Sequence, residues 1–66
     1  MNSKELRGAF IDETPVKYKG AIYKKINRIS FLKSKEGNVI EHATLVDLCG
    51  RSEVTVPGKD VEACEN

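Results

Sequence analysis

Lysine and aromatic residues alternate in one short stretch of the sequence, KYKGAIYKKINRISF at positions 17–31. Tyr18, Tyr23 and Phe31 could stack on nucleic-acid bases, while the cations between them could neutralise phosphates. A stacked base contributes roughly 1–3 kcal/mol, and phosphate contacts add affinity that falls with salt. The candidate binding surface that this pattern predicts consists of the basic residues Lys17, Lys19, Lys24, Lys25, Arg28, Lys33 and Lys35.

The overall charge argues against a large surface for nucleic acid. The formal net charge is +1 and the pI is about 7.8, whereas nucleic-acid-binding domains usually have a pI above ~9. Residues 1–35 carry nine Lys and Arg against three Asp and Glu, whereas residues 36–66 carry two against seven. The two halves could pair these charges as neighbouring strands, with Tyr23 and Phe31 in the core and the lysines in solvent. This interpretation favours a protein partner over nucleic acid.

The residues that could support nucleophilic catalysis are dispersed. A nucleophile needs a base within reach and a third group that orients the base. His42 is the single histidine, and strand alternation directs Glu41 and Cys49 to the face opposite its ring. The sequence therefore predicts an exposed or half-buried strand histidine and a protein that is not an enzyme.

Motifs for metals and cofactors are lacking. A structural zinc site takes four ligands, usually from close pairs of Cys or His, but Cys49 and Cys64 lie fifteen positions apart in a chain with one histidine. Neither the GxxxxGKS/T nor the GxGxxG phosphate-binding motif occurs. The sequence predicts no metal, no cofactor, and two reduced cysteines that act as small core residues.

A single domain must position these residues, because a chain of 66 residues buries only one small core. We divide the chain into an N-terminal arm at 1–14 and a β domain at 15–66. The segment LRGAFID at 6–12 fits either a short strand or a helical turn. Pro15 separates this segment from the strands that follow.

The first half of the β domain contains an apolar run that changes phase. Lys19-Gly20 predicts a tight turn before it, because glycine readily adopts a positive φ. In residues 21–33, Ile22 and Ile26 share one parity, whereas Tyr23, Ile29 and Phe31 share the other. A bulge or sharp bend near Asn27-Arg28 would reconcile the two sets. The predicted core from this run is Ile22, Tyr23, Ile26, Ile29 and Phe31.

The second half of the β domain alternates strands with turns. A hairpin loop at 34–38, with Gly37-Asn38 suited to left-handed backbone, leads into a long strand at 39–50. In the next strand, EVTVP at 53–57, Val54 and Val56 face inward and Pro57 ends the ladder. A turn or 3₁₀ turn and a short last strand, VEA at 61–63, follow.

The order of these elements resembles a small SH3-like barrel. The stretch VPGKDVE at 56–62 is similar to the strand, tight turn and closing strand that end many such barrels. The chain also resembles short accessory proteins of bacterial mobile elements and phages, which often carry such barrels. The resemblance implies an all-β fold, a small SH3-like barrel of four to five strands in meander order with a short irregular or helical N-terminal segment, and a binding role.

These features together predict a non-enzymatic binding module, foremost a protein-interaction adaptor or inhibitor. The alternative is a nucleic-acid-binding accessory protein that uses the basic face of residues 17–35. No stretch approaches the ~20 apolar residues that span a bilayer, and no signal-peptide pattern occurs, so we expect a cytoplasmic protein. An open edge strand could also pair two copies into a homodimer.

Overall fold

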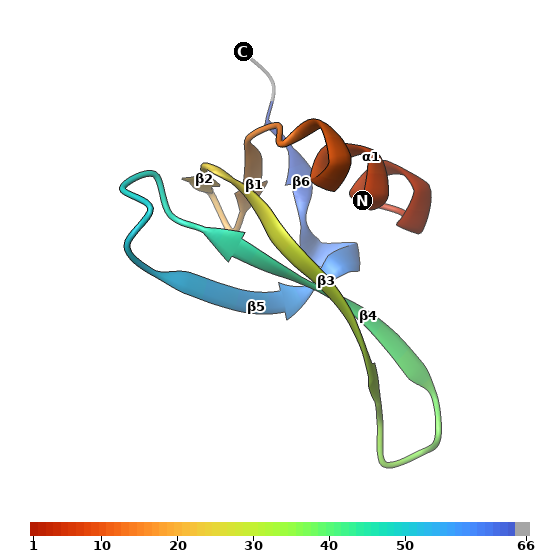
Figure 1. The fold of residues 1–66 in the computed structure, drawn as a ribbon. Coiled ribbons are helices and arrows are strands. Elements are labelled where there is room, and N and C mark those ends of the chain that lie inside the picture. Colours follow the sequence, from red (N-terminus) through yellow and green to blue (C-terminus); the bar gives the residue numbers. More distant parts are fainter. Residues whose placement is uncertain (65–66) are drawn as a thin grey trace.

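The architecture is mostly β, as the sequence predicts, but it has two separate sheets. The computed structural model describes residues 1–64, and strands make up 47% of it. One antiparallel sheet has the strand order β2-β1-β6, and the other has the order β3-β4-β5. The sheets are not closed into a barrel, so the SH3-like barrel stays a prediction. The elements (Figure 1) are α1 (Ser3–Asp12), β1 (Val16–Tyr18), β2 (Ala21–Tyr23), β3 (Lys25–Lys33), β4 (Val39–Val46), β5 (Glu53–Pro57), the 3₁₀ helix η1 (Gly58–Asp60) and β6 (Glu62–Ala63).

The N-terminal segment forms a helix, which is one of the two forms that the sequence leaves open. The Asn2 side chain accepts a hydrogen bond from the Glu5 backbone at 2.8 Å, and the Glu5 carboxylate accepts one from the Asn2 backbone at 3.1 Å. The helix ends where Glu13 takes a left-handed conformation with a φ of 54°. Leu6 and Ala9, one helical turn apart, are buried in the core.

Two hairpin turns follow the sequence prediction. The β1–β2 hairpin closes through Lys19 and Gly20, whose φ angles of 48° and 82° define a two-residue turn of the kind that matches strand twist. The β3–β4 hairpin turns at Gly37, which has a φ of 89°. There the Ser34 backbone donates a hydrogen bond to the Asn38 carbonyl at 2.7 Å.

The apolar run at 21–33 forms two strands because the chain changes sheets at Lys24. The Lys24 backbone donates to the Val46 carbonyl at 2.8 Å, which fixes the corner between β2 and β3. The register of β3 against β4 shifts between Ile26 and Arg28. The predicted bulge at Asn27-Arg28 is therefore confirmed, whereas the corner between sheets lies three residues before Asn27.

The core predicted from the run at 21–33 is partly wrong. Ile26 is fully buried, and Tyr23 and Ile29 pack against the core at its margin. Ile22 and Phe31 are 47% and 56% exposed. Ile22 lies opposite Lys17, on the face of its sheet away from the buried Val16, and Phe31 lies in the half of β3 toward the β3–β4 loop, opposite Glu41. The buried cluster consists of Leu6, Ala9, Val16, Ile26, Ala43, Leu45, Val56 and Val61.

The strand expected at 39–50 ends early, at Val46, because a turn begins at Asp47. The Asp47 carboxylate accepts hydrogen bonds from the Arg51 backbone at 3.0 Å and from the Ser52 hydroxyl. Cys49 lies exposed in this turn, so its predicted place in the core is wrong.

The remaining C-terminal predictions agree with the structure in most details. The strand β5 ends at Pro57, and η1 and β6 follow it. Val56 is buried as predicted, and Val54 shares its face opposite the buried Leu45, although Val54 stays 37% exposed at the end of the strand. Cys64 is half-buried, and both cysteines are free thiols.

Candidate functional site

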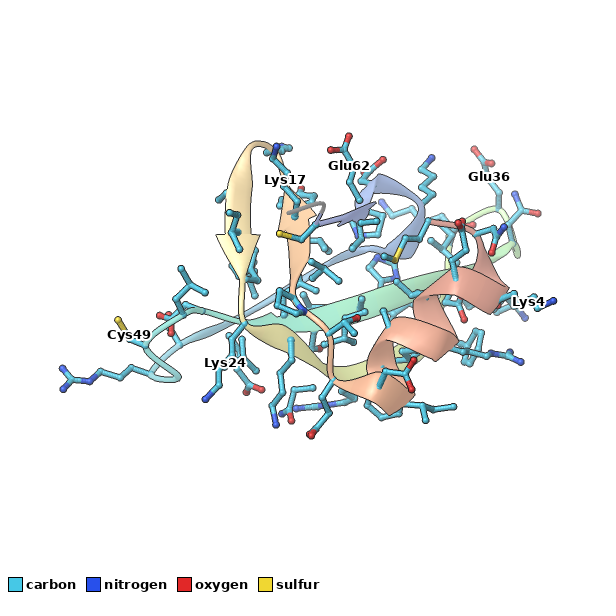
Figure 2. All side chains as sticks on the ribbon, turned by 90° about the horizontal axis from the view of Figure 1, so that it is seen from above. Lys4, Lys17, Lys24, Glu36, Cys49 and Glu62 are labelled. Atoms are coloured by element: carbon cyan, nitrogen blue, oxygen red, sulfur yellow. The ribbon has the colours of Figure 1, made fainter. Side chains whose placement is uncertain are left out.

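The seven basic residues of the predicted surface follow one path of the chain. Lys24 and Lys25 line a common hollow with Glu53, whereas Lys17 lines another beside Glu62. Lys17 and Lys24 lie on opposite sides of the molecule (Figure 2). The path runs through β1 (Lys17), the β1–β2 turn (Lys19), the corner between sheets (Lys24), β3 (Lys25, Arg28, Lys33) and the β3–β4 loop (Lys35).

Two of these cations have acidic neighbours within the fold. The Lys25 Nζ atom lies 3.0 Å from the Glu13 Oε1 atom. Lys17 lies opposite Glu62 in the β1–β6 ladder, and both residues occupy one side of the molecule (Figure 2). The sequence favours pairing between the basic residues of 1–35 and the acidic residues of 36–66. Lys17 and Glu62 form such a pair across β1 and β6, whereas Lys25 pairs with Glu13, which belongs to the same half of the chain.

The three aromatic residues of the same stretch have different surroundings. Tyr18 and Tyr23 are half-buried and pack against the core. The Lys19 Nζ atom lies 5.4 Å from the centroid of the Tyr18 ring, within the range of a cation–π contact. Phe31, in contrast to the tyrosines, is well exposed.

Phe31 belongs to an apolar groove between α1 and β3. The groove has a volume of about 470 Å³. Ile11 is 75% exposed at its helical wall, and Phe10 and Phe31 are also exposed. The residues that line it are Arg7, Phe10 and Ile11 of α1 and Asn27, Arg28, Ile29 and Phe31 of β3.

The helix supplies one wall of this groove through its periodicity. Leu6 and Ala9 point into the core, whereas Arg7, Phe10 and Ile11 stand at the i, i+3 and i+4 spacing that places side chains on one face. Sequence reasoning missed this wall because the apolar residues of 6–12 fit a strand as well as a helix. The signal that could have found it is the capping pair Asn2 and Glu5, which marks a helix start.

The electrostatic character of the groove is cationic. Arg7 and Arg28 line it, and no acidic side chain among residues 1–64 does. The Arg7 Nε atom lies 4.0 Å from a Glu41 oxygen, but its side chain is largely exposed, so this ion pair is weak. Asn27 donates from its amide to the Glu53 carboxylate at 2.6 Å, which holds the bulged residue toward β5.

The outer edge of β3 borders the same groove. In the sheet order β3-β4-β5, this strand pairs only with β4 within residues 1–64. Apart from that ladder, no backbone hydrogen bond joins residues 25–33 to another described element. The outward backbone groups of an edge strand are available to pair with another chain.

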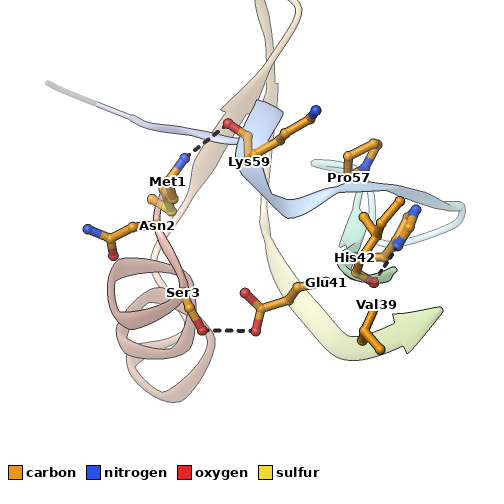
Figure 3. Close-up of a pocket in the computed structure, with 9 residues that line it drawn as sticks. Met1, Asn2, Ser3, Val39, Glu41, His42, Pro57 and Lys59 are labelled. Carbon is orange, nitrogen blue, oxygen red and sulfur yellow. Dashed lines mark hydrogen bonds between the residues drawn. The ribbon is translucent and has the colours of Figure 1, made fainter. Parts of the chain in front are cut away.

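A second hollow, of about 430 Å³, lies between the start of α1 and the β4–η1 region (Figure 3). The Ser3 hydroxyl donates to the Glu41 carboxylate at 3.2 Å, and the His42 Nδ1 atom lies 3.1 Å from the Ile40 carbonyl oxygen. His42 is half-buried, as predicted, and follows Glu41 on the other face of β4. The polar groups of this hollow thus bind one another, and Ser3 has no contact with an imidazole base.

Potential metal ligands are not grouped. Within residues 1–64, no three His, Cys, Asp or Glu side chains come close enough to hold one ion. Cys49 lies at the far end of the molecule from the β3–β4 loop that contains Glu36 (Figure 2).

Comparison with known proteins adds no relative. No family model, curated protein or solved structure matches this chain. No helix among residues 1–64 is long and apolar enough to cross a membrane. The groove between α1 and β3 and the strand edge beside it are the features of the described residues that suit binding of a ligand.

Proposed function

We propose that this chain is a protein-binding module that holds a segment of its partner in the groove between α1 and β3. The observation that carries the proposal is the exposure of Phe10, Ile11 and Phe31 around one hollow. A chain of this size can bury few large apolar residues, yet it places three of them together at the surface. Complete burial of one such side chain contributes about 1.5–3 kcal/mol, so a partner that covers them gains affinity.

The groove suits a peptide segment better than a broad protein surface. Its floor is one strand, β3, and its wall is the stripe of Arg7, Phe10 and Ile11 on α1. Recognition sites of this form anchor a few side chains while the rest of the contact excludes water. An adaptor or inhibitor role follows, in which this chain captures an exposed segment of a larger protein.

A random peptide library displayed on phage provides the first test. We expect selection on the wild-type protein to recover peptides whose affinity falls about tenfold or more with Phe31→Ala or Ile11→Ala, since each change removes an apolar anchor. The matched control is Leu48→Ala, which truncates an equally exposed apolar residue in the turn after β4. Peptides that bind Phe31→Ala and Ile11→Ala as tightly as wild type would contradict the proposal.

The alternative function, nucleic-acid binding through residues 17–35, calls for a separate titration. Isotope-labelled protein is mixed with a short oligonucleotide of mixed sequence at about 50 and 200 mM salt, and amide signals are followed. The protein-binding proposal predicts signals that stay in place. Shifts confined to residues 17–35 that vanish at the higher salt would support the nucleic-acid function in its place.

A further inference from the structure

We propose that the partner segment binds in extended form and adds to the outer edge of β3 as a new strand of the β3-β4-β5 sheet. Its apolar side chains face α1, and its acidic side chains face the side of Arg28. This inference deepens the proposed function and rests on it. Three features of the described residues carry it: an unpaired edge, an apolar wall along that edge, and a cationic strand.

The edge offers the length that strand addition needs. β3 has nine residues, against eight in β4 and five in β5, and in the described part of the chain it pairs on one side only. In an antiparallel ladder, alternate residues direct both their N–H and C=O groups toward one neighbour, so the remaining residues of β3 direct theirs outward. These groups lie beside the groove, because Asn27, Arg28, Ile29 and Phe31 of β3 form its floor.

The register of β3 determines what an added strand would meet. Phe31 lies opposite Glu41, whose carboxylate accepts a hydrogen bond from Ser3, so this face of the sheet is the one toward α1. Arg28 lies opposite Thr44, on the other face, and reaches the groove at its rim. A strand on this edge therefore places alternate side chains beside Phe31 and the others beside Arg28.

The charge of β3 specifies the chemistry of the occupant. Lys25, Arg28 and Lys33 are its charged residues, and it contains no Asp or Glu. Opposite charges on paired strands stabilise a sheet, whereas like charges destabilise it. The register places Lys25 and Arg28 on the face away from Phe31, and Lys25 already pairs with Glu13. An added strand with acidic residues on that face therefore complements Arg28 above all, and apolar residues on its other face complement the apolar groove.

The same charge disfavours a second copy as the occupant. Two β3 strands paired with each other would bring the cations Lys25, Arg28 and Lys33 of both copies onto one small sheet. Lysine on an edge strand is a common protection against such self-pairing. An acidic, apolar segment of another protein overcomes this protection, because it replaces repulsion with attraction.

Synthetic peptides test the inference directly. The probe is a nine-residue peptide of alternating isoleucine and glutamate with a fluorescent label, which matches β3 in length. Two methylated forms keep every side chain, and each carries N-methyl groups on the amides that point to one side of the extended peptide. We expect one methylated form to lose at least tenfold in affinity and the other to bind like the parent, because only one side pairs with β3.

Charge-changed partners provide the matched control. A peptide of alternating isoleucine and lysine should bind wild type at least tenfold more weakly than the glutamate peptide. Arg28→Glu should reduce binding of the glutamate peptide and improve binding of the lysine peptide, which a merely misfolded variant cannot do. Lys59→Glu, in η1 outside the groove, should leave both affinities close to those of wild type.

The outcomes separate this inference from the function on which it rests. Equal affinity of the parent and both methylated peptides would overturn strand addition, as would failure of the glutamate probe while library peptides still bind the groove. In both cases the protein-binding function survives. Sedimentation that shows a dimer whose β3 amides are protected from exchange would assign the edge to a second copy. Absence of any groove-dependent peptide in the library selection would overturn the proposed function itself.

Discussion

The two ends of the β3–β4 hairpin share one ladder but have opposite surroundings. Near its base, Ile26 lies opposite Leu45, and both side chains are fully buried. Near its loop, Leu32 lies opposite Ile40, and both side chains are exposed, Leu32 by 51%. Ile26 and Leu45 lie on the face that α1 covers, whereas Leu32 and Ile40 lie on the opposite face of the sheet. The cover over a face, and not strand pairing alone, thus determines which apolar pairs are buried.

Truncation of a core residue at the buried end of the hairpin should have the largest effect and tests this comparison. Leu45→Ala should lower the free energy of unfolding by about 2–5 kcal/mol, because it leaves a cavity in a small core. Urea denaturation followed by circular dichroism measures the change. Leu32→Ala, at the exposed end, should stay within about 0.5 kcal/mol of wild type.

If Leu45→Ala does not fold, Ile26→Val provides the milder version at the same end, with an expected loss of about 0.5–1.5 kcal/mol. If Leu32→Ala lowers the free energy of unfolding as much as Ile26→Val, the exposed end of the hairpin stabilises the fold as much as the buried end, which contradicts the comparison.

A substitution at Gly58 should have the next largest effect, because η1 packs closely against α1 and β4 at this residue. A Cβ atom at Gly58 would lie 2.6 Å from the buried Leu6 Cδ2 atom and 3.3 Å from the Glu41 carbonyl oxygen. We expect Gly58→Ala to cost about 1–3 kcal/mol in thermal or urea unfolding. Gly8→Ala is the matched control, since nothing lies near its Cβ and alanine favours the helix by up to about 1 kcal/mol. Similar stability losses for both variants would show that the close approach at Gly58 is not specific.

Removal of the N-terminal cap of α1, the wall of the groove, compares the stability of this helix with that of the buried end of the hairpin. Asn2→Ala should cost about 1 kcal/mol, because the side-chain acceptor for the Glu5 backbone N–H is lost. Amide hydrogen exchange should show faster opening in α1 than at the hairpin base. The control Asn2→Asp keeps a capping acceptor and should restore slow exchange in α1. Uniformly faster exchange across all elements would contradict a local effect.

The smallest effect concerns the turn after β4. Hydrogen bonds from the Ser52 hydroxyl and the Arg51 backbone lower the pKa of Asp47 below its usual value. Because the folded-state pKa is lowered, the stabilisation is present above the usual aspartate pKa and is lost as the pH falls through the folded-state value. Carboxyl signals in an NMR titration should show this shift, and Ser52→Ala should reduce it. An Asp47 that titrates identically in wild type and Ser52→Ala would exclude the hydroxyl as its cause.

Local patterns in the sequence predicted the strands, turns and bulge well. The change of apolar phase located the bulge at Asn27, and Lys19-Gly20 located the first hairpin turn, because both depend on a few neighbouring residues. Burial was harder to predict, because alternation assigns a residue to a face without showing what covers that face. Phe31 illustrates this limit, since it shares a face with Ile29 yet lies exposed, whereas Ile22 lies on the outer face of its own sheet, opposite Lys17.

The groove itself could not be predicted from the sequence. Arg28 was identified as a binding residue for its charge, whereas Phe10 and Ile11 become site residues only once α1 is known to be a helix beside β3. Contacts between segments distant in the sequence create such a site, and no local pattern encodes them. The division into two sheets, likewise, depends on how β2 and β3 diverge at Lys24.

The bulge at Asn27 has an evolutionary consequence. It allows Ile26 and Ile29, which are three positions apart, to share the face that α1 covers. Loss of the Asn27 codon would restore strict alternation and leave Arg28 opposite Thr44 and Phe31 opposite Glu41, because the bulged residue has no partner of its own in β4. A lineage can thus gain or lose this codon while every other side chain of β3 keeps its face of the sheet.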